Sequence, residues 1–254
     1  MKLISLKELT SFVNDNIVGF HQSRLNRLEN IELNEVLRKK NPYLFKAKNI
    51  SIASDLVQGV LDAFLSSTEE ELFGQFLEDL AIFVVSRTCG GQKSPAEGID
   101  FEFENDGVHY VVSVKSGTNW GNSAQQKKQE TNFQTALKIL RQSQHTKNVE
   151  AVLGCCYGKT KTSYLRGYKK IVGQSFWYFI SGNANLYTDI IEPLGHKARE
   201  HNDDFLLQKG KVINLFSRQF MDDYCDNGTI NWKRLVEYNS GNLSKCTKIS
   251  DRGR

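Results

Sequence analysis

Residues 99–115 read IDFEFENDGVHYVVSVK, and here the chain changes its pattern. Apolar and acidic side chains alternate from Ile99 to Glu104, and a run rich in β-branched residues follows from Val108 to Lys115. A period of two is typical of strands. The residues between the runs, Asn105-Asp106-Gly107, contain the Asp-Gly pair favoured in two-residue hairpin turns. The stretch therefore predicts a β-hairpin in which Asn105 pairs with Val108.

This register places Asp100 opposite Ser113 and makes Asp100 and Lys115 diagonal neighbours, with backbones about 7 Å apart. One face of the hairpin is expected to join the core and carries Ile99, Phe101, Phe103, Tyr110, Val112 and Val114. The other face carries Asp100, Glu102, Glu104, His109, Val111, Ser113 and Lys115. A carboxylate and an amine thus meet at the open end of the hairpin.

Phosphodiester hydrolysis uses this combination of groups. A carboxylate such as Asp100 can hold a divalent cation, and the ammonium group of Lys115 can position the nucleophile and offset negative charge at the phosphate. The backbone carbonyl of Val114 could add an oxygen ligand, and hard oxygen ligands suit Mg²⁺. The alternative is an ordinary hairpin with acids on its solvent face and a solvated lysine at its end.

Two neighbouring segments favour the catalytic interpretation. Residues 116–123, which follow Lys115, are rich in small and amide side chains that suit close approach to phosphates and base edges. Upstream, Gly74 and Glu78 are spaced one helical turn apart, so that bare backbone lies beside a carboxylate, and Glu71 shares this face. Glu78 could equally be an ordinary exposed helix acid.

The rest of the chain predicts an α/β protein. Apolar residues at helical spacing indicate helices between Ser5 and Ser66, with a further helix that begins after the capping residues Ser66-Ser67-Thr68. Residues 89–95 are expected to form a loop, residues 124–142 a helix, residues 149–157 and 175–180 strands, and the tail from Ile190 mostly helices. We expect a single nuclease domain over residues 1–254, with a helical N-terminal region at 1–66 and the nuclease core and helical tail at 67–254.

Composition is that of an ordinary globular protein. The chain has 254 residues, and 33 Lys and Arg against 29 Asp and Glu give a net charge of +4, which permits nucleic-acid binding without requiring it. No apolar run reaches the roughly 18 residues of a membrane span, and the first residues lack the apolar core of a signal peptide, so a cytoplasmic protein is expected. Five cysteines, two of them adjacent at Cys155-Cys156, indicate reduced structural thiols.

The order of these motifs resembles the PD-(D/E)XK nuclease superfamily, in which a central mixed β-sheet is flanked by helices. Within it, the chain resembles a family of type II restriction endonucleases whose better-known member cuts a degenerate GC-rich heptamer of the RGGNCCY type. The likeness runs from about Ser66 to Trp232. Its motifs are Glu71-Leu72-Phe73-Gly74, Gly98-Ile99-Asp100, Lys115-Ser116-Gly117, Asn119-Trp120-Gly121-Asn122-Ser123, Gly154-Cys155-Cys156-Tyr157-Gly158 and Glu192-Pro193-Leu194-Gly195-His196-Lys197.

The resemblance implies Mg²⁺-dependent, sequence-specific cleavage of double-stranded DNA, with Asp100 as the metal-binding acid and Lys115 as the catalytic lysine. It also implies a cognate DNA methyltransferase in the cell. The chain departs from the pattern at Ser113, because the superfamily usually has an acid two residues before the lysine. Some restriction enzymes take that carboxylate from a helix, and the candidates are Glu78, which we favour, Glu71, Glu130 and, on the hairpin, Glu102. The residues expected to contact DNA are Lys93, Ser116, Asn119, Trp120, Asn122, Ser123 and Lys127.

Other functions remain open at this level. The same surface could bind DNA without chemistry, or serve a nicking or repair nuclease of the same fold, and His196, His201 and Asn202 could belong to a His-Asn nuclease. The cations and tyrosines between Lys159 and Lys170 suit either a DNA-facing surface or an exposed strand edge. Cutting both strands calls for two active sites, so a homodimer is expected. The helices between Ser5 and Ser66 could form its interface or only cover the sheet of their own subunit.

Overall fold

The computed structural model describes residues 1–143 and 148–242, in two compact units. The sheet unit comprises residues 1–22 and 70–200, and the helical unit comprises residues 23–69 and 201–254. The chain passes from one unit to the other within α1 (Leu6–Glu29), α4 (Ala53–Thr88) and α9 (Ala198–Tyr224). The boundary expected at residue 66 therefore lies inside a helix.

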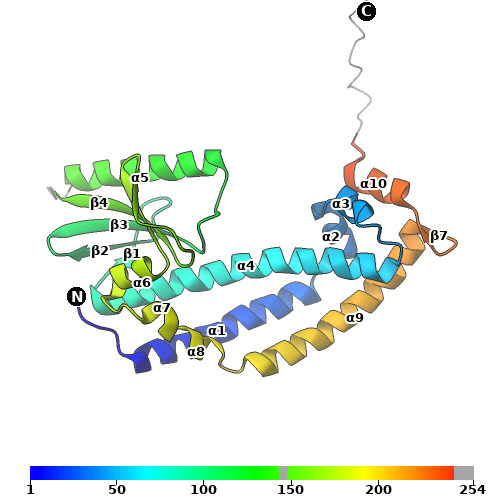
Figure 1. The fold of residues 1–254 in the computed structure, drawn as a ribbon, viewed down its shortest axis with the longest axis horizontal. Coiled ribbons are helices and arrows are strands. Elements are labelled where there is room, and N and C mark those ends of the chain that lie inside the picture. The colour runs from blue at the N-terminus through cyan, green and yellow to red at the C-terminus, as the bar shows by residue number, and fades with distance from the viewer. Residues whose placement is uncertain (144–147, 243–254) are drawn as a thin grey trace, which may run out of the picture. The chain divides into compact units, whose positions relative to one another are not determined.

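The centre of the sheet unit is a mixed sheet, as the resemblance implied, and it has six strands (Figure 1). Its strands are β1 (Gln92–Lys93), β2 (Phe101–Asn105), β3 (Val108–Lys115), β4 (Val149–Cys155), β5 (Ser163–Leu165) and β6 (Tyr168–Val172). They lie in the order β1-β2-β3-β4-β6-β5, in which β3, β4 and β6 are parallel and the outer pairs are antiparallel. The carboxyl ends of the three parallel strands share one edge.

The hairpin of β2 and β3 has the predicted register. Asn105 pairs with Val108, and the ladder continues to the pair of Phe101 with Val112. Asp106 and Gly107 both have positive φ, at 51° and 74°, which is the conformation that a type I′ turn requires. The Asp-Gly turn thus fixes the alignment of Asp100 with Ser113.

Helices cover both faces of the sheet (Figure 1). On one face, α5 (Ser123–Ser143) packs through Phe133, Ala136 and Leu137 onto Val111 and Leu153. On the other face lie the first turns of α1, the carboxyl half of α4, α6 (Gln174–Ser181) and α7 (Leu186–Asp189). The short α8 (Ile191–Leu194) follows. The central strands are therefore buried on both sides, as parallel strands generally are.

This double coverage corrects part of the predicted hairpin faces. Val111 and Ser113 were assigned to a polar face, but both are buried, because α5 covers that end of the hairpin. Ile99 was assigned to the face of Phe101 but packs on the opposite face with Val111. The reason is local: β2 begins at Phe101, and Ile99 lies in a turn in which its N–H donates to the carbonyl of Ala96 at 3.2 Å.

Two predicted elements were wrong. Residues 175–180 form the helix α6 instead of a strand, since the apolar run FWYFI reads equally well in either form. The break predicted at Ser66-Ser67-Thr68 is absent from α4. There the hydroxyls of Ser67 and Thr68 donate to the carbonyls of Ala63 and Phe64, four residues earlier, at 3.1 and 3.2 Å. They are therefore satisfied within a continuous helix instead of capping a new one.

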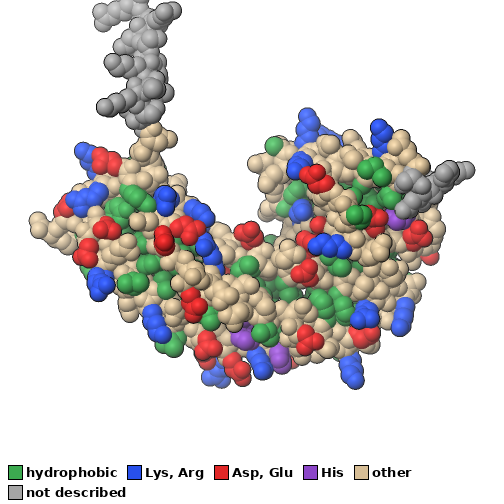
Figure 2. Space-filling model, turned by 180° about the vertical axis from the view of Figure 1, so that it is seen from behind, with side chains coloured by type: hydrophobic (Ala, Val, Ile, Leu, Met, Phe, Trp, Pro, Cys, Tyr) green, Lys and Arg blue, Asp and Glu red, His purple; other side chains and the backbone are tan. Residues whose placement is uncertain are grey.

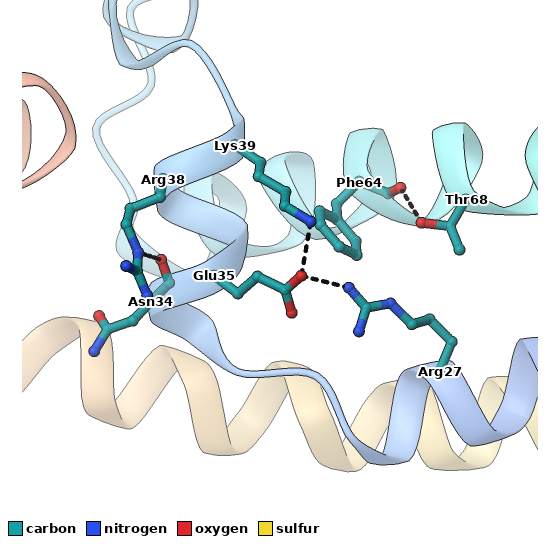
Figure 3. A network of polar contacts seen from close by, with 7 residues as sticks. All are labelled: Arg27, Asn34, Glu35, Arg38, Lys39, Phe64 and Thr68. Atoms are coloured by element: carbon teal, nitrogen blue, oxygen red, sulfur yellow. Dashed lines mark hydrogen bonds and ion pairs between the residues drawn. The ribbon is translucent and has the colours of Figure 1, made fainter.

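The helical unit packs α2 (Leu33–Lys39), α3 (Pro42–Ala47) and α10 (Trp232–Ser240) with parts of α1, α4 and α9 around its own core. A two-stranded hairpin, β7 (Cys225–Asp226) with β8 (Thr229–Ile230), precedes α10. Glu35 accepts hydrogen bonds from Arg27 at 2.5 Å and from Lys39 at 2.9 Å (Figure 3). The guanidinium of Arg27 lies 5.1 Å from the ring centre of Phe64. This network joins α1, α2 and α4 within the unit.

Lys and Arg side chains are interspersed with Asp and Glu on the face that Figure 2 shows, so charge alone marks no DNA-binding surface there. Among the described residues, none of the helices combines the length and apolar character that crossing a membrane would require. Cys89, Cys155, Cys156 and Cys225, the cysteines within the described ranges, are free thiols.

Candidate active site

Asp100 lies just before β2, and its carboxylate is held by β3. Its Oδ2 accepts a hydrogen bond of 2.5 Å from the backbone N–H of Val114 and one of 3.2 Å from the hydroxyl of Ser113. Burial raises the pKa of Asp100, while the Val114 hydrogen bond and the charge of Lys115 act in the opposite direction. The predicted neighbours Asp100 and Ser113 are thus in direct contact, and the carboxylate is fixed and partly desolvated.

Lys115 is the last residue of β3 and is half-buried. Its Nζ lies 5.4 Å from the ring centre of Trp120, within the range of a cation–π interaction. Trp120 in turn packs against the hydrophobic cluster under α5. The ammonium group is therefore held close to the sheet edge, where its charge acts on both Asp100 and Glu78.

Glu78 reaches the same edge from α4. One turn earlier on that helix, Gly74 is so close to the loop after β3 that an added Cβ would lie 2.7 Å from Oγ of Ser116. Residues four apart share a helix face, so the carboxylate of Glu78 lies on the side of α4 that meets this loop. Burial and then the negative charge of Asp100 raise the pKa of Glu78, and the charge of Lys115 lowers it. The structure thus brings Asp100, Lys115 and Glu78 together.

The loop of residues 116–123 connects this site to α5. Asn119 is exposed, whereas Asn122 caps α5: its Oδ1 accepts hydrogen bonds of 3.1 Å from the N–H groups of Ala124 and Gln125. A surface hollow opens beside Lys115 and is lined also by Trp120, Gln125, Lys128 and Asn132. The loop therefore presents polar groups at the sheet edge, between Lys115 and the cations of α5.

A model of a known protein family matches most of the chain. The model of the type II restriction endonuclease EcoO109I matches residues 7–202. The chain belongs to the EcoO109I family of type II restriction endonucleases. No curated protein matches the sequence.

Membership of the EcoO109I family makes the protein a hydrolase that cuts DNA at specific sequences. The matched residues contain the hairpin, the loop after it, and the part of α4 that carries Gly74 and Glu78. Type II restriction endonucleases generally use a divalent metal ion. The expected fold, enzyme class and DNA substrate are thus confirmed.

The residues at the sheet edge fit a hard divalent cation. The described part of the chain has no group of three or more His, Cys, Asp and Glu side chains that could hold a metal. Two carboxylates with a carbonyl oxygen are nevertheless enough for Mg²⁺, which usually keeps several waters and takes one or two protein carboxylates. The C=O and N–H of a strand residue point to the same side, so the Val114 carbonyl is directed to the side on which Asp100 lies.

The other candidate acids have different surroundings. Glu102 accepts a hydrogen bond of 2.5 Å from Ser94 and lies 3.1 Å from Nε2 of His109. Glu130 pairs with Arg166 at 3.6 Å. Glu71 is exposed on α4. Glu78, by contrast, has a pKa that burial raises and that the charges of Asp100 and Lys115 shift in opposite directions.

The remaining residues predicted to contact DNA lie around the site. Lys93 is exposed on β1, opposite Phe101, and its charge lowers the pKa of Asp100. Lys127 is exposed in the first turns of α5, and Ser123 is the first residue of that helix. Their contacts with DNA remain predictions.

Gln129 is a residue of this site that the sequence reasoning missed. Its side chain is buried on α5, and Nε2 donates a hydrogen bond of 2.8 Å to the carbonyl of Gly98. Gly98 has a φ of 71°, and an added Cβ would lie 2.1 Å from the amide nitrogen of Asn132. Gln129 thus fixes the turn that leads into Asp100. Its position four residues before Phe133, on the apolar face of the helix, was the available signal.

The two adjacent thiols are buried and unreactive, and His196 lies in a different hollow. Cys155 and Cys156 are buried, and burial raises the pKa of both, which disfavours the reactive thiolate. His196 lines a separate surface hollow with Thr10 and Asp189. The interpretation of the two cysteines as structural thiols fits this environment.

Proposed function

We propose that this endonuclease hydrolyses DNA with Mg²⁺ held by Asp100 and Glu78, with the Val114 carbonyl as a further oxygen ligand and Lys115 as the catalytic lysine. The active site would then be a PD-(D/E)XK site in which a helix supplies the carboxylate that Ser113 lacks. The observation that carries the proposal is the close approach of Gly74 to Ser116, which puts the helix face of Glu78 at the sheet edge where β3 holds Asp100.

In this proposed site, Asp100 and Lys115 each have a defined role in hydrolysis. When bound, the ion supplies Lewis-acid polarisation of the scissile phosphate and a water of lowered pKa. Asp100 is oriented by Val114 and Ser113, so its carboxylate needs little rearrangement to act as a ligand. The ammonium group of Lys115 donates hydrogen bonds to the attacking water or to a phosphate oxygen and offsets negative charge as it grows.

Glutamine variants of the candidate acids test which carboxylate is used. We expect Glu78→Gln to lower the cleavage rate on the order of 10²-fold or more, because it removes a charged ligand while it preserves side-chain volume. Glu130→Gln, whose parent residue pairs with Arg166, is the matched control and should cleave nearly as well as the wild type.

The substrate should be plasmid DNA and duplexes that contain RGGNCCY sites, in Mg²⁺ and in EDTA. If Glu130→Gln loses more activity than Glu78→Gln, the helix after the catalytic lysine supplies the acid. If neither variant loses activity, Glu102 becomes the candidate. Cleavage in EDTA at the rate seen in Mg²⁺ would refute the metal-dependent mechanism.

We further propose that the enzyme acts as a homodimer and that a cognate methyltransferase protects the DNA of the cell. Each chain has a single Asp100 and Lys115, so two chains supply the two sites that a double-strand cut requires. Leu9, Val13 and Ile17 of α1 pack in the core of the sheet unit, which supports a covering role for this part of the N-terminal helices. In the helical unit, Tyr43, Leu44 and Ile52 are exposed apolar residues and are the candidate contacts with a second copy.

Light scattering of the free enzyme and of its complex with a cognate duplex tests the dimer. We expect the mass of two chains in the complex and a lower mass for Leu44→Glu. A strictly monomeric enzyme that nicks one strand at a time would refute the dimer and leave the nuclease mechanism intact.

A further inference from the structure

The loops that follow β3 and β4 lie side by side at the edge of the sheet that carries Lys115. The parallel pairing of β3 with β4 ends with Lys115 opposite Cys155. Beyond it, the N–H of Cys156 donates to the carbonyl of Lys115 and the N–H of Tyr157 donates to that of Ser116, both at 2.9 Å. The position of Tyr157 is thus fixed relative to the catalytic lysine.

The ring of Tyr157 lies across the backbone of Gly117. A Cβ added to Gly117 would lie 2.5 Å from one ring carbon and 2.8 Å from the hydroxyl oxygen of Tyr157. The indole N–H of buried Trp177 donates a hydrogen bond of 2.9 Å to the carbonyl of Cys156 and so anchors the residue before it. Tyr157 is nevertheless 61% exposed. A large side chain is therefore held in a defined position at the surface. It lies over Gly117, which is two positions after Lys115 in the neighbouring loop.

The charges in these two segments are all of one sign. The sequence contains no Asp or Glu between Gly107 and Gln129 or between Ala151 and Thr188, although these acids make up 29 of the 254 residues. Lys159 and Lys161 follow Tyr157 and are both exposed. A positive loop next to the site of phosphate chemistry complements the backbone of DNA.

We propose that the loop from Tyr157 to Lys161 is a DNA-binding segment of this enzyme. The Tyr157 hydroxyl donates a hydrogen bond to a backbone phosphate that flanks the scissile one, and Lys159 and Lys161 neutralise further phosphates of the duplex. Tyrosine hydroxyls and lysines are common partners of DNA phosphates, and such contacts set the position of the protein on the duplex. The proposal rests on the active site proposed above, because that site defines which phosphate is cut.

Equilibrium binding in EDTA over a series of salt concentrations tests the segment without any chemistry. The probe is a fluorescein-labelled duplex of mixed sequence, and the variants are Lys159→Ala, Lys161→Ala and Tyr157→Phe. Each lysine variant should reduce the slope of log affinity against log salt by about 1. Tyr157→Phe should lower the affinity about tenfold with little change in slope, because it removes a hydrogen bond to a charged group but no charge.

Two controls come from the same unit. Lys138→Ala changes an exposed lysine in the carboxyl half of α5, and Tyr178→Phe changes an exposed tyrosine that lines a hollow with Asn105 and Asp106, at the hairpin-turn end of β3. Both should bind like the wild type. Wild-type affinity and slope in all three loop variants would overturn the proposal, as would equal losses in the controls.

Gly117→Ala tests the placement of the ring. Its methyl group must displace Tyr157, so the variant should show at least the loss of affinity of Tyr157→Phe while its melting temperature confirms that it folds. Wild-type binding by Gly117→Ala would show that the ring position is not used. These binding results do not depend on cleavage. An Asp100→Asn enzyme that still cuts DNA would refute the assignment of the active site, but the binding data would stay unchanged.

Discussion

The carboxylate of Asp100 lies 2.5 Å from the backbone nitrogen of Val114, the residue directly before Lys115. Asp100→Asn keeps an oxygen that can accept this hydrogen bond but removes the charge that would hold a cation. We expect cleavage to fall on the order of 10³-fold, and Lys115→Ala to have a similar effect, because both groups act on charge at the phosphate. The preference for cognate over mixed-sequence DNA in EDTA should stay within about twofold of the wild type, since neither group reads bases.

Asp15→Asn is a suitable control for this pair, because Asp15 is an exposed acid of α1. It should cleave like the wild type in single-turnover assays. Normal cleavage by purified Asp100→Asn would show that Asp100 is not an active-site residue.

The raised pKa of Asp100 has a consequence for stability. Burial makes the folded protein bind a proton at Asp100 more readily than the unfolded chain does. The contribution of Asp100 to the free energy of unfolding is therefore largest at low pH, and it is lost as the pH rises from about 4 through the native pKa. At about pH 7 the metal-free Asp100→Asn protein should therefore have a higher melting temperature than the wild type, because asparagine carries no charge that burial penalises. A thermal melt in EDTA that shows a lower melting temperature would contradict this sign.

Ser113 donates one of the two hydrogen bonds that Oδ2 of Asp100 receives from β3. Ser113→Ala leaves the bond from the Val114 N–H in place, so we expect the single-turnover cleavage rate to fall by about three- to tenfold, which corresponds to the loss of one modest hydrogen bond. Complete loss of cleavage by a folded Ser113→Ala enzyme would mean that the hydroxyl itself contacts the metal or the phosphate.

Gln129 holds the turn before Asp100 through its bond to the Gly98 carbonyl. Gln129→Leu cannot donate this bond, and the turn should relax. We expect the Mg²⁺ concentration for half-maximal cleavage to rise about tenfold, because a ligand that is less well oriented binds the metal more weakly. Gln134→Leu, on an exposed position of the same helix, is the matched control. An unchanged Mg²⁺ requirement in Gln129→Leu, together with a lower melting temperature, would indicate a purely structural role.

The hairpin and the mixed sheet could be predicted because local chemistry determines them. Asp106-Gly107 selects one turn type, and a turn of known length fixes every pair from Asn105 to Asp100. The resemblance to a nuclease family then supplied a mixed sheet flanked by helices, but not the order of its strands. By contrast, the burial of Val111 and Ser113 depends on α5, which packs on the hairpin from a later segment of the chain.

The errors have similar physical causes. The hydroxyls of Ser67 and Thr68 can cap a new helix or bond back to the previous turn, and the sequence around them satisfies either role.

The site residues differ in how visible they are in the sequence. Glu78 was favoured from its spacing with Gly74, and the structure supports its position by the close approach of Gly74 to Ser116. Gln129 was missed because a buried amide on an apolar helix face gives no motif until its partner, the Gly98 carbonyl, is known.

The origin of the two proposed carboxylates also bears on when the enzyme becomes active during synthesis. Asp100 comes from the entry to a hairpin that local interactions can form, but Glu78 arrives only when α4 packs across the sheet. A nascent or partly unfolded chain would therefore hold one metal ligand side chain instead of two. This dependence on long-range packing would delay cleavage of DNA until the folding of the chain is complete.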